Sequence, residues 1–302
     1  GNPSENNRRG VCDKAVKEFG ATEIMLHTQD NLRISSLYFK RPNAPLNIIY
    51  VTGYFHDQTP TKQWAAPFAL LFPTFNILTF DWRGFGDSEG RRGDKIGKTD
   101  FGTNAYWDIQ AAIDFVKKDN DKPIVLVGFC AGAAMIIKAT IEAQKVGQKT
   151  ADALVLNSIF SEFANQFNRA VIVSENRILM KAIANIGISK LIIQNSLNGS
   201  LFDLKPVEMI EQITVPCYFE HFILDPSAIV EEGIQVFNKT KTFKKFELST
   251  IGIHVRIHKE VPFQVRNNFY EFLLESKLLS QEQLDATKTQ DLEDDQKVLN
   301  KK

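Results

Sequence analysis

Short apolar runs recur along the chain, and segments with helical periodicity lie between most of them. Such runs are typical of buried strands, and strands that alternate with helices indicate a mostly parallel sheet. Ahead of these runs, β-prone residues 23–27 and 32–40 flank the turn cluster Gln29-Asp30-Asn31, which predicts an antiparallel hairpin. The predicted strands of the parallel part are residues 47–52, 76–81, 122–127, 153–157, 215–221 and 243–249. The fold class expected from this pattern is α/β.

Helices are predicted between the strands from the spacing of their apolar residues. Trp107, Ile109, Ile113 and Val116 fall on one face of a segment at 102–118, which should pack on the sheet. Further helices are expected at 131–146, 206–210 and 261–274. Residues 159–203 break the alternation and are too many for a structureless loop. We therefore predict a helical cap at 159–203, inserted into a core made of residues 21–158 and 204–278.

The two ends of the chain differ from this core in composition. Residues 1–20 are polar and form an expected lead-in, and residues 279–302 are charged and expected to be disordered. The acidic stretch at 291–295 is interpreted as part of a solvated tail. Because the sequence begins with Gly1 rather than Met, we expect a trimmed N-terminus, and both a cytoplasmic and an exported location stay open.

Composition and charge exclude several classes of function. Lysine and arginine together number 36, as do aspartate and glutamate, so the chain lacks the excess positive charge that holds nucleic acid. No apolar run approaches the ~20 residues that a membrane-spanning helix needs. The spacing of Cys12, Cys130 and Cys217 fits neither a disulfide framework nor a zinc site. With no phosphate loop or dinucleotide fingerprint, no cofactor and no metal are expected, and the oligomeric state stays open.

The segment richest in chemistry is Gly128-Phe129-Cys130-Ala131-Gly132, which follows an apolar run and precedes a helical pattern. This is the pattern of a nucleophile elbow, with sulfur in place of the usual oxygen. Glycine two positions before and after the nucleophile avoids collisions with the neighbouring strand and helix. The helix that begins after Cys130 favours negative charge at its N-terminus and so favours the thiolate. The alternative is a small buried cysteine between two packing glycines.

Two segments resemble the α/β-hydrolase family. The elbow is one, and the other is Asp81 to Gly90, which resembles the Asp-x-Arg-Gly-x-Gly-x-Ser-x-Gly segment of the monoglyceride-lipase and serine-aminopeptidase-like branch. The resemblance extends over about residues 46–274 and implies the α/β-hydrolase fold, a central sheet flanked by helices with a cap. Most members carry serine at the elbow. The family uses this segment to shape the turn after a strand, which implies a structural role, not a catalytic one, for Asp81, Arg83 and Ser88.

The resemblance also implies the partners of Cys130. The family places its acid after the next-to-last strand and its base after the last, which points to Asp225 and His254, with His258 as a second candidate for the base. Phe222 stands where the family has glycine. His221 falls at a position that is structural in the family.

An oxyanion hole is implied by the same resemblance. The backbone N–H groups of Tyr54 and Ala131 are the candidates for it. Tyr54 follows Gly53, and Thr52 replaces the histidine that is usual before that glycine.

Together these residues predict an enzyme, an acyl hydrolase of esters or thioesters with a moderately apolar small-molecule substrate. His254 would take the Cys130 proton, the thiolate would attack the acyl carbon, and Asp225 would orient the imidazolium. A thioester intermediate passes its acyl group to amines and thiols more readily than an ester does. The sequence therefore leaves open an acyltransferase on the same triad, and also a retired hydrolase fold that binds a ligand or protein without turnover.

Overall fold

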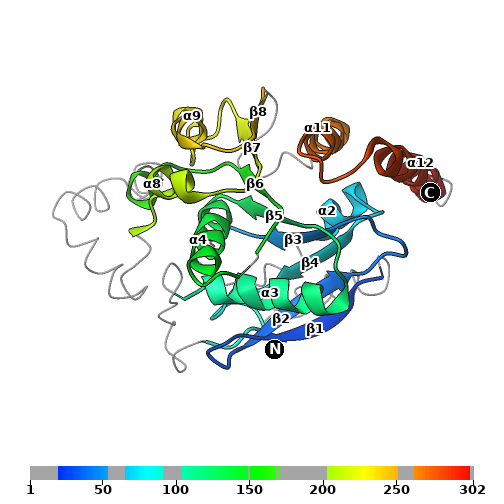
Figure 1. Ribbon diagram of the computed structural model, residues 1–302, viewed down its shortest axis with the longest axis horizontal. Coiled ribbons are helices and arrows are strands. Elements are labelled where there is room, and N and C mark those ends of the chain that lie inside the picture. The colour runs from blue at the N-terminus through cyan, green and yellow to red at the C-terminus, as the bar shows by residue number, and fades with distance from the viewer. Residues whose placement is uncertain are drawn as a thin grey trace, which may run out of the picture.

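The computed structural model describes residues 20–53, 65–90, 104–148, 150–166, 169, 203–250 and 262–299. Within this part of the chain, eight strands form one sheet in the order β1-β2-β4-β3-β5-β6-β7-β8 (Figure 1). The strands are β1 (Thr22–His27), β2 (Arg33–Phe39), β3 (Asn47–Val51), β4 (Asn76–Phe80), β5 (Ile124–Phe129), β6 (Ala153–Asn157), β7 (Cys217–Phe222) and β8 (Lys244–Ser249).

The sheet is parallel from β4 through β8, as the alternating pattern predicts. Strands β1 and β2 form the expected hairpin, with Thr22 opposite Tyr38, and β2 also runs antiparallel to β4. Strands β3, β4, β5, β6 and β7 are buried along their whole length. This burial on both faces explains why they read as continuous apolar runs rather than as alternating ones.

Helices cover both faces of the sheet (Figure 1). On one face, α3, α4, α8 and α9 enclose a core with Ile49 of β3 and Leu126 of β5; on the other, α2, α11 and α12 enclose a core with Ile48 and Val125. The helices are α2 (Ala66–Leu71), α3 (Tyr106–Asp119), α4 (Ala131–Lys145), α8 (Pro206–Met209) with the 3-10 turn Ile210–Gln212, α9 (Val230–Lys239), α11 (Pro262–Glu275) and α12 (Gln281–Leu299).

The C-terminal segment corrects the expectation of a disordered tail, because residues 281–299 form helix α12. Its buried positions Leu284, Thr287 and Asp291 are 2%, 5% and 2% exposed and recur at helical spacing. The side chain of Asp291 accepts a hydrogen bond from Tyr270 of α11, and Arg266 pairs with Asp295 at 2.6 Å. Two of the three buried positions are polar, so the hydrophobic pattern alone does not reveal this packed face.

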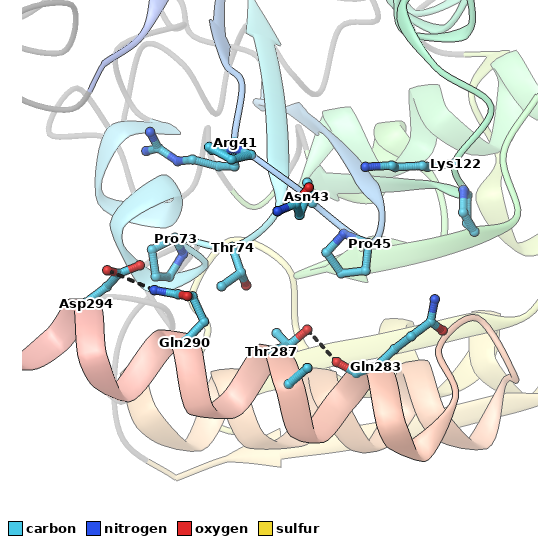
Figure 2. A pocket seen from close by; sticks show the side chains of 14 residues that line it. Arg41, Asn43, Pro45, Pro73, Thr74, Lys122, Gln283, Thr287, Gln290 and Asp294 are labelled. Atoms are coloured by element: carbon cyan, nitrogen blue, oxygen red, sulfur yellow. Dashed lines mark hydrogen bonds between the residues drawn. The ribbon is translucent and has the colours of Figure 1, made fainter.

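A groove of about 950 Å³ separates α12 from the turns that precede β3, β4 and β5 (Figure 2). Thr287 and Gln290 of α12 face Asn43, Pro73 and Thr74 across it. These turns precede the parallel strands, so the groove lies at the end of the sheet opposite to the carboxyl end of β5.

In the described part of the chain, no helix is long and apolar enough to cross a membrane. The predicted cap lies largely outside the described residues, which include only positions 159–166, 169 and 203 of it.

Candidate active site

Cys130 sits at the turn between β5 and α4, as the glycine pattern predicts. Its backbone has φ 54° and ψ −118°, a conformation that residues with a Cβ rarely adopt and that costs about 1–3 kcal/mol. The surrounding structure holds it there, because the Cys130 N–H donates to the Asn157 carbonyl of β6 at 2.8 Å. A strained residue between a strand and a helix is the geometry of a nucleophile elbow.

Both elbow glycines make approaches that a side chain would block. A Cβ at Gly128 would lie 2.7 Å from the Cα of Ala133, at the start of α4. A Cβ at Gly132 would lie 2.4 Å from the carbonyl oxygen of Thr52 and 2.5 Å from that of Val51, at the end of β3. The two glycines thus allow the helix to begin against its own strand and against the neighbouring one.

The end of β3, just before the predicted oxyanion-hole residue Tyr54, lies beside the elbow. A Cβ at Gly53 would lie 3.4 Å from the Cβ of Cys130, so this glycine is in direct contact range of the elbow. Thr52, which replaces the usual histidine, accepts a hydrogen bond on its carbonyl oxygen from the Trp82 indole at 3.1 Å. Ala131 opens α4, and in the described part of the chain its N–H has no acceptor. Tyr54, the other predicted donor, lies outside the described residues.

Asp225 follows β7 at the same edge of the sheet as the elbow, because β5, β6 and β7 are parallel. Its side chain is 3% exposed, and its Oδ1 accepts hydrogen bonds from the N–H groups of Ser227 and Ala228, both at 2.9 Å. These two bonds orient the carboxylate in its loop despite Phe222 at the family's glycine position. His254 and His258 lie outside the described residues, so the expected triad stays a prediction.

His221 packs inside the molecule, away from solvent. Its Nε2 lies 2.8 Å from the carbonyl oxygen of Ala228, and a Cβ at Gly233 of α9 would lie 2.5 Å from its Nδ1. The imidazole therefore ties the loop that carries Asp225 to α9.

The segment after β4 is held by ion pairs and hydrogen bonds within the protein. Arg83 is 2% exposed, and its guanidinium pairs with Asp30 and Asp108, each at 2.8 Å. The Ser88 hydroxyl donates to the Asp81 carbonyl at 2.6 Å. The Arg83 ion pairs connect the β1–β2 turn to α3, and the Ser88 hydrogen bond closes the turn after β4. Both are structural roles of the kind expected for Arg83 and Ser88.

The structure adds a residue to the elbow that the sequence pattern did not indicate. Gln166 lies on the helical turn at 163–166, and its Nε2 donates to the Cys130 Sγ at 2.8 Å. Both side chains are buried, with exposed fractions of 8% and 9%. No motif marks a glutamine for such a contact, because the contact depends on how the chain returns over β5 after β6.

A buried carboxyl lies behind the elbow. Burial raises the pKa of Glu220 on β7 to about 7, although Asn157 donates to its side chain at 3.1 Å. The backbone of the same residue accepts the N–H of Ser158 at 2.9 Å. Asn157 and Ser158 follow one another at the end of β6, so Glu220 supports the strand end to which the Cys130 N–H is bonded.

Across the described residues, no group of three His, Cys, Asp or Glu side chains is placed to hold a metal ion.

Comparisons with known proteins agree with this geometry. A family model for the alpha/beta hydrolase fold matches residues 48–177, which include the elbow. No curated protein matches the chain significantly.

Several solved structures are similar to the chain in fold. The Pyrococcus furiosus esterase Pf2001 has a TM-score of 0.64 at 19% identity, with 90% of this chain and 94% of the esterase covered. The alpha/beta hydrolase GrgF from Penicillium sp. sh18 has a TM-score of 0.66 at 16% identity, over 85% of this chain and 98% of its own. The acylaminoacyl peptidase of Pyrococcus horikoshii has a TM-score of 0.58 at 16% identity, over 88% of this chain and 42% of its own. The eight-stranded sheet, the elbow and these comparisons together show that the chain has the alpha/beta-hydrolase fold.

Proposed function

We propose that the protein is an acyl hydrolase that cleaves esters or thioesters through a covalent intermediate on Cys130. The observation that carries this proposal is the backbone of Cys130, held at φ 54° at the end of β5 between two glycines that cannot be larger. A buried structural cysteine has no need of such a conformation, which lifts a side chain to the end of the sheet at a cost in stability. Solved structures of similar fold include an esterase and an acylaminoacyl peptidase.

The proposed reaction has two halves. In the first, His254 takes the Cys130 proton, the thiolate adds to the acyl carbon, and the Ala131 and Tyr54 N–H groups receive the negative oxygen. The intermediate collapses to a thioester on Cys130 while His254 returns the proton to the departing alcohol or thiol. In the second, His254 takes a proton from the water that attacks the thioester, and returns it to the Cys130 sulfur as the carboxylic acid is released. Asp225 orients the imidazole and stabilises its charged form.

Turnover tests the proposal. Wild type and Cys130→Ala are compared on short and long acyl esters and thioesters, with Cys217→Ala as the matched control. Cys217 is a suitable control because it is fully buried in β7, where burial raises the pKa of its thiol to about 12. Wild type and Cys217→Ala should release product at similar rates, and Cys130→Ala should lose at least ~10³-fold in kcat/KM. Equal rates for wild type and Cys130→Ala on every substrate would overturn the proposal.

A further inference from the structure

Gln166 contacts the proposed nucleophile directly, although it comes from a different part of the chain. Its Nε2 donates to the Cys130 Sγ at 2.8 Å, and the two residues are 36 positions apart. A donor at this distance stabilises a thiolate more than a neutral thiol, because hydrogen bonds to a charged acceptor are the stronger ones. The amide therefore lies in direct contact with the sulfur atom that would carry the acyl group.

The helical turn that carries Gln166 is anchored on both sides by Glu232 of α9. The Ser161 N–H donates to Glu232 Oε2 at 3.1 Å, and the Arg169 guanidinium forms two hydrogen bonds with the same carboxylate, both at 2.8 Å. Arg169 also donates through Nε to the Ser227 carbonyl at 3.2 Å, beside the turn that holds Asp225. The position of Gln166 is therefore set by the fold at both of its flanks.

The amide oxygen of Gln166, Oε1, indicates what the site could bind. Gln166 Oε1 is buried and accepts no hydrogen bond from any of the described residues. Because the two heteroatoms of an amide are about 2.3 Å apart, Oε1 lies within about 5 Å of the Cys130 Sγ. A buried acceptor without a donor costs about 1–3 kcal/mol, so such an atom beside a nucleophile calls for a ligand that supplies the donor.

We propose that Gln166 Oε1 accepts a hydrogen bond from the acyl part of the substrate. The site then takes acyl groups that carry a hydroxyl or an amide N–H on the carbon next to the scissile carbonyl, as in 2-hydroxyacyl and N-acylaminoacyl esters or thioesters. Once the acyl carbon is bonded to Sγ, a donor at this position lies close to the Gln166 amide. The inference rests on the proposed function, since it takes Cys130 as the residue that receives the acyl group.

The hydrogen bond can be tested without turnover by alkylating Cys130 with two matched reagents. Iodoacetamide carries an N–H donor next to its carbonyl, and N,N-dimethyl-2-iodoacetamide carries none. Rates at Cys130 are followed by peptide mass spectrometry, and their ratio is divided by the same ratio for glutathione. Wild type should prefer iodoacetamide by about tenfold after this correction, which corresponds to one good hydrogen bond.

Two variants separate the acceptor of Gln166 from its donor. Gln166→Met has similar length and no amide, so its corrected ratio should fall to about one. Gln166→Glu keeps an acceptor oxygen, so it should keep a preference for iodoacetamide even where its overall rate changes. A corrected ratio near one in wild type, or a wild-type ratio that survives in Gln166→Met, would overturn the inference.

A turnover comparison distinguishes this inference from the proposed function. The 2-hydroxypropionyl and propionyl thioesters of one thiol differ only in the donor, and wild type should favour the first by about tenfold in kcat/KM, a preference that Gln166→Met loses. Equal turnover of both thioesters by wild type would overturn the substrate class and leave the hydrolase intact. If wild type turns over no acyl substrate but prefers iodoacetamide, the proposed hydrolase function is wrong, and the hydrogen bond to Gln166 Oε1 is still supported.

Discussion

The backbone conformation of Cys130 depends on its neighbours in the chain. Its left-handed backbone exists because the strand before it and the helix after it are both bonded in place, through the N–H to Asn157 and the carbonyl to Ala133 at 3.0 Å. The strain is tolerable only where glycine stands at both close approaches. Small substitutions at these glycines should therefore lower the free energy of unfolding more than substitutions of Cys130 itself.

Gly132→Ala tests this at the level of one methyl group. The new Cβ would lie 2.4 Å from the Thr52 carbonyl oxygen, a backbone atom at the end of β3 that cannot rotate away. We expect a loss of about 3 kcal/mol or more in the free energy of unfolding, measured by urea denaturation.

Gly147→Ala is the matched control, since it has φ 70° and nothing within 4 Å of the new Cβ. It should cost only the strain of a left-handed residue, about 1–2 kcal/mol. Equal losses in the two variants would show that the close approach to β3 contributes nothing.

Among the elements, those that the sequence predicts best are the ones whose environment is uniform. The strands of the parallel sheet are buried on both faces, so their apolar runs stand out, and the elbow is marked by its two glycines. Strand β5 nevertheless ends at Phe129, two residues later than expected, because Gly128 and Phe129 still pair with Leu156 and Asn157 of β6. Gly128, which the sequence pattern places in a turn, is therefore still paired within the sheet.

The elements that the sequence does not predict depend on tertiary contacts. Helix α9 contains Gly233, a weak helix former, which is needed because His221 packs against it. Helix α12 has a mean composition too polar to indicate burial, and Gln166 belongs to no motif at all. Each of these becomes recognisable only when the partner across the core is known. For the same reason the expected base His254 rests on the resemblance alone.

Helix α12 should contribute to stability through Leu284. This side chain is 2% exposed in the core formed with α2 and α11, whereas Leu292 on the same helix is 63% exposed. Leu284→Ala should lower the free energy of unfolding by about 3 kcal/mol, and Leu292→Ala by less than about 0.5 kcal/mol. Thermal and urea unfolding of the two variants provide the comparison. Similar small effects from both would mean that α12 does not pack as described.

At the scale of the whole molecule, two buried carboxyls contribute to stability most strongly at acidic pH. Burial raises the pKa of Glu220 from 4.5 to about 7 and that of Asp291 from 3.8 to about 6. A raised pKa means that the folded protein keeps a proton which the unfolded chain has already released. These two groups therefore contribute less to the free energy of unfolding as the pH rises from about 4.5 to about 7, and the contribution of Glu220 falls by about 3 kcal/mol.

Glu220→Gln isolates this contribution, because glutamine has the shape of the protonated acid and can still accept the hydrogen bond from Asn157. The variant should match wild type at pH 4.5 and exceed it in stability at pH 8, by a difference that develops between those values. Urea unfolding curves at several pH values measure it. A variant that is less stable than wild type at pH 8 would show that the ionised carboxylate is favoured in the folded protein.

The proposed function depends on an acyl group carried by Cys130, and trapping that group is the most direct test. Wild type and His254→Ala are mixed with an activated ester, quenched in acid within seconds, digested and examined by peptide mass spectrometry. We expect the acyl mass on Cys130 of wild type, its removal by neutral hydroxylamine as expected for a thioester, and much slower labelling in His254→Ala. Product release by wild type with the acyl mass on another side chain, or undiminished product release by Cys130→Ala, would contradict it.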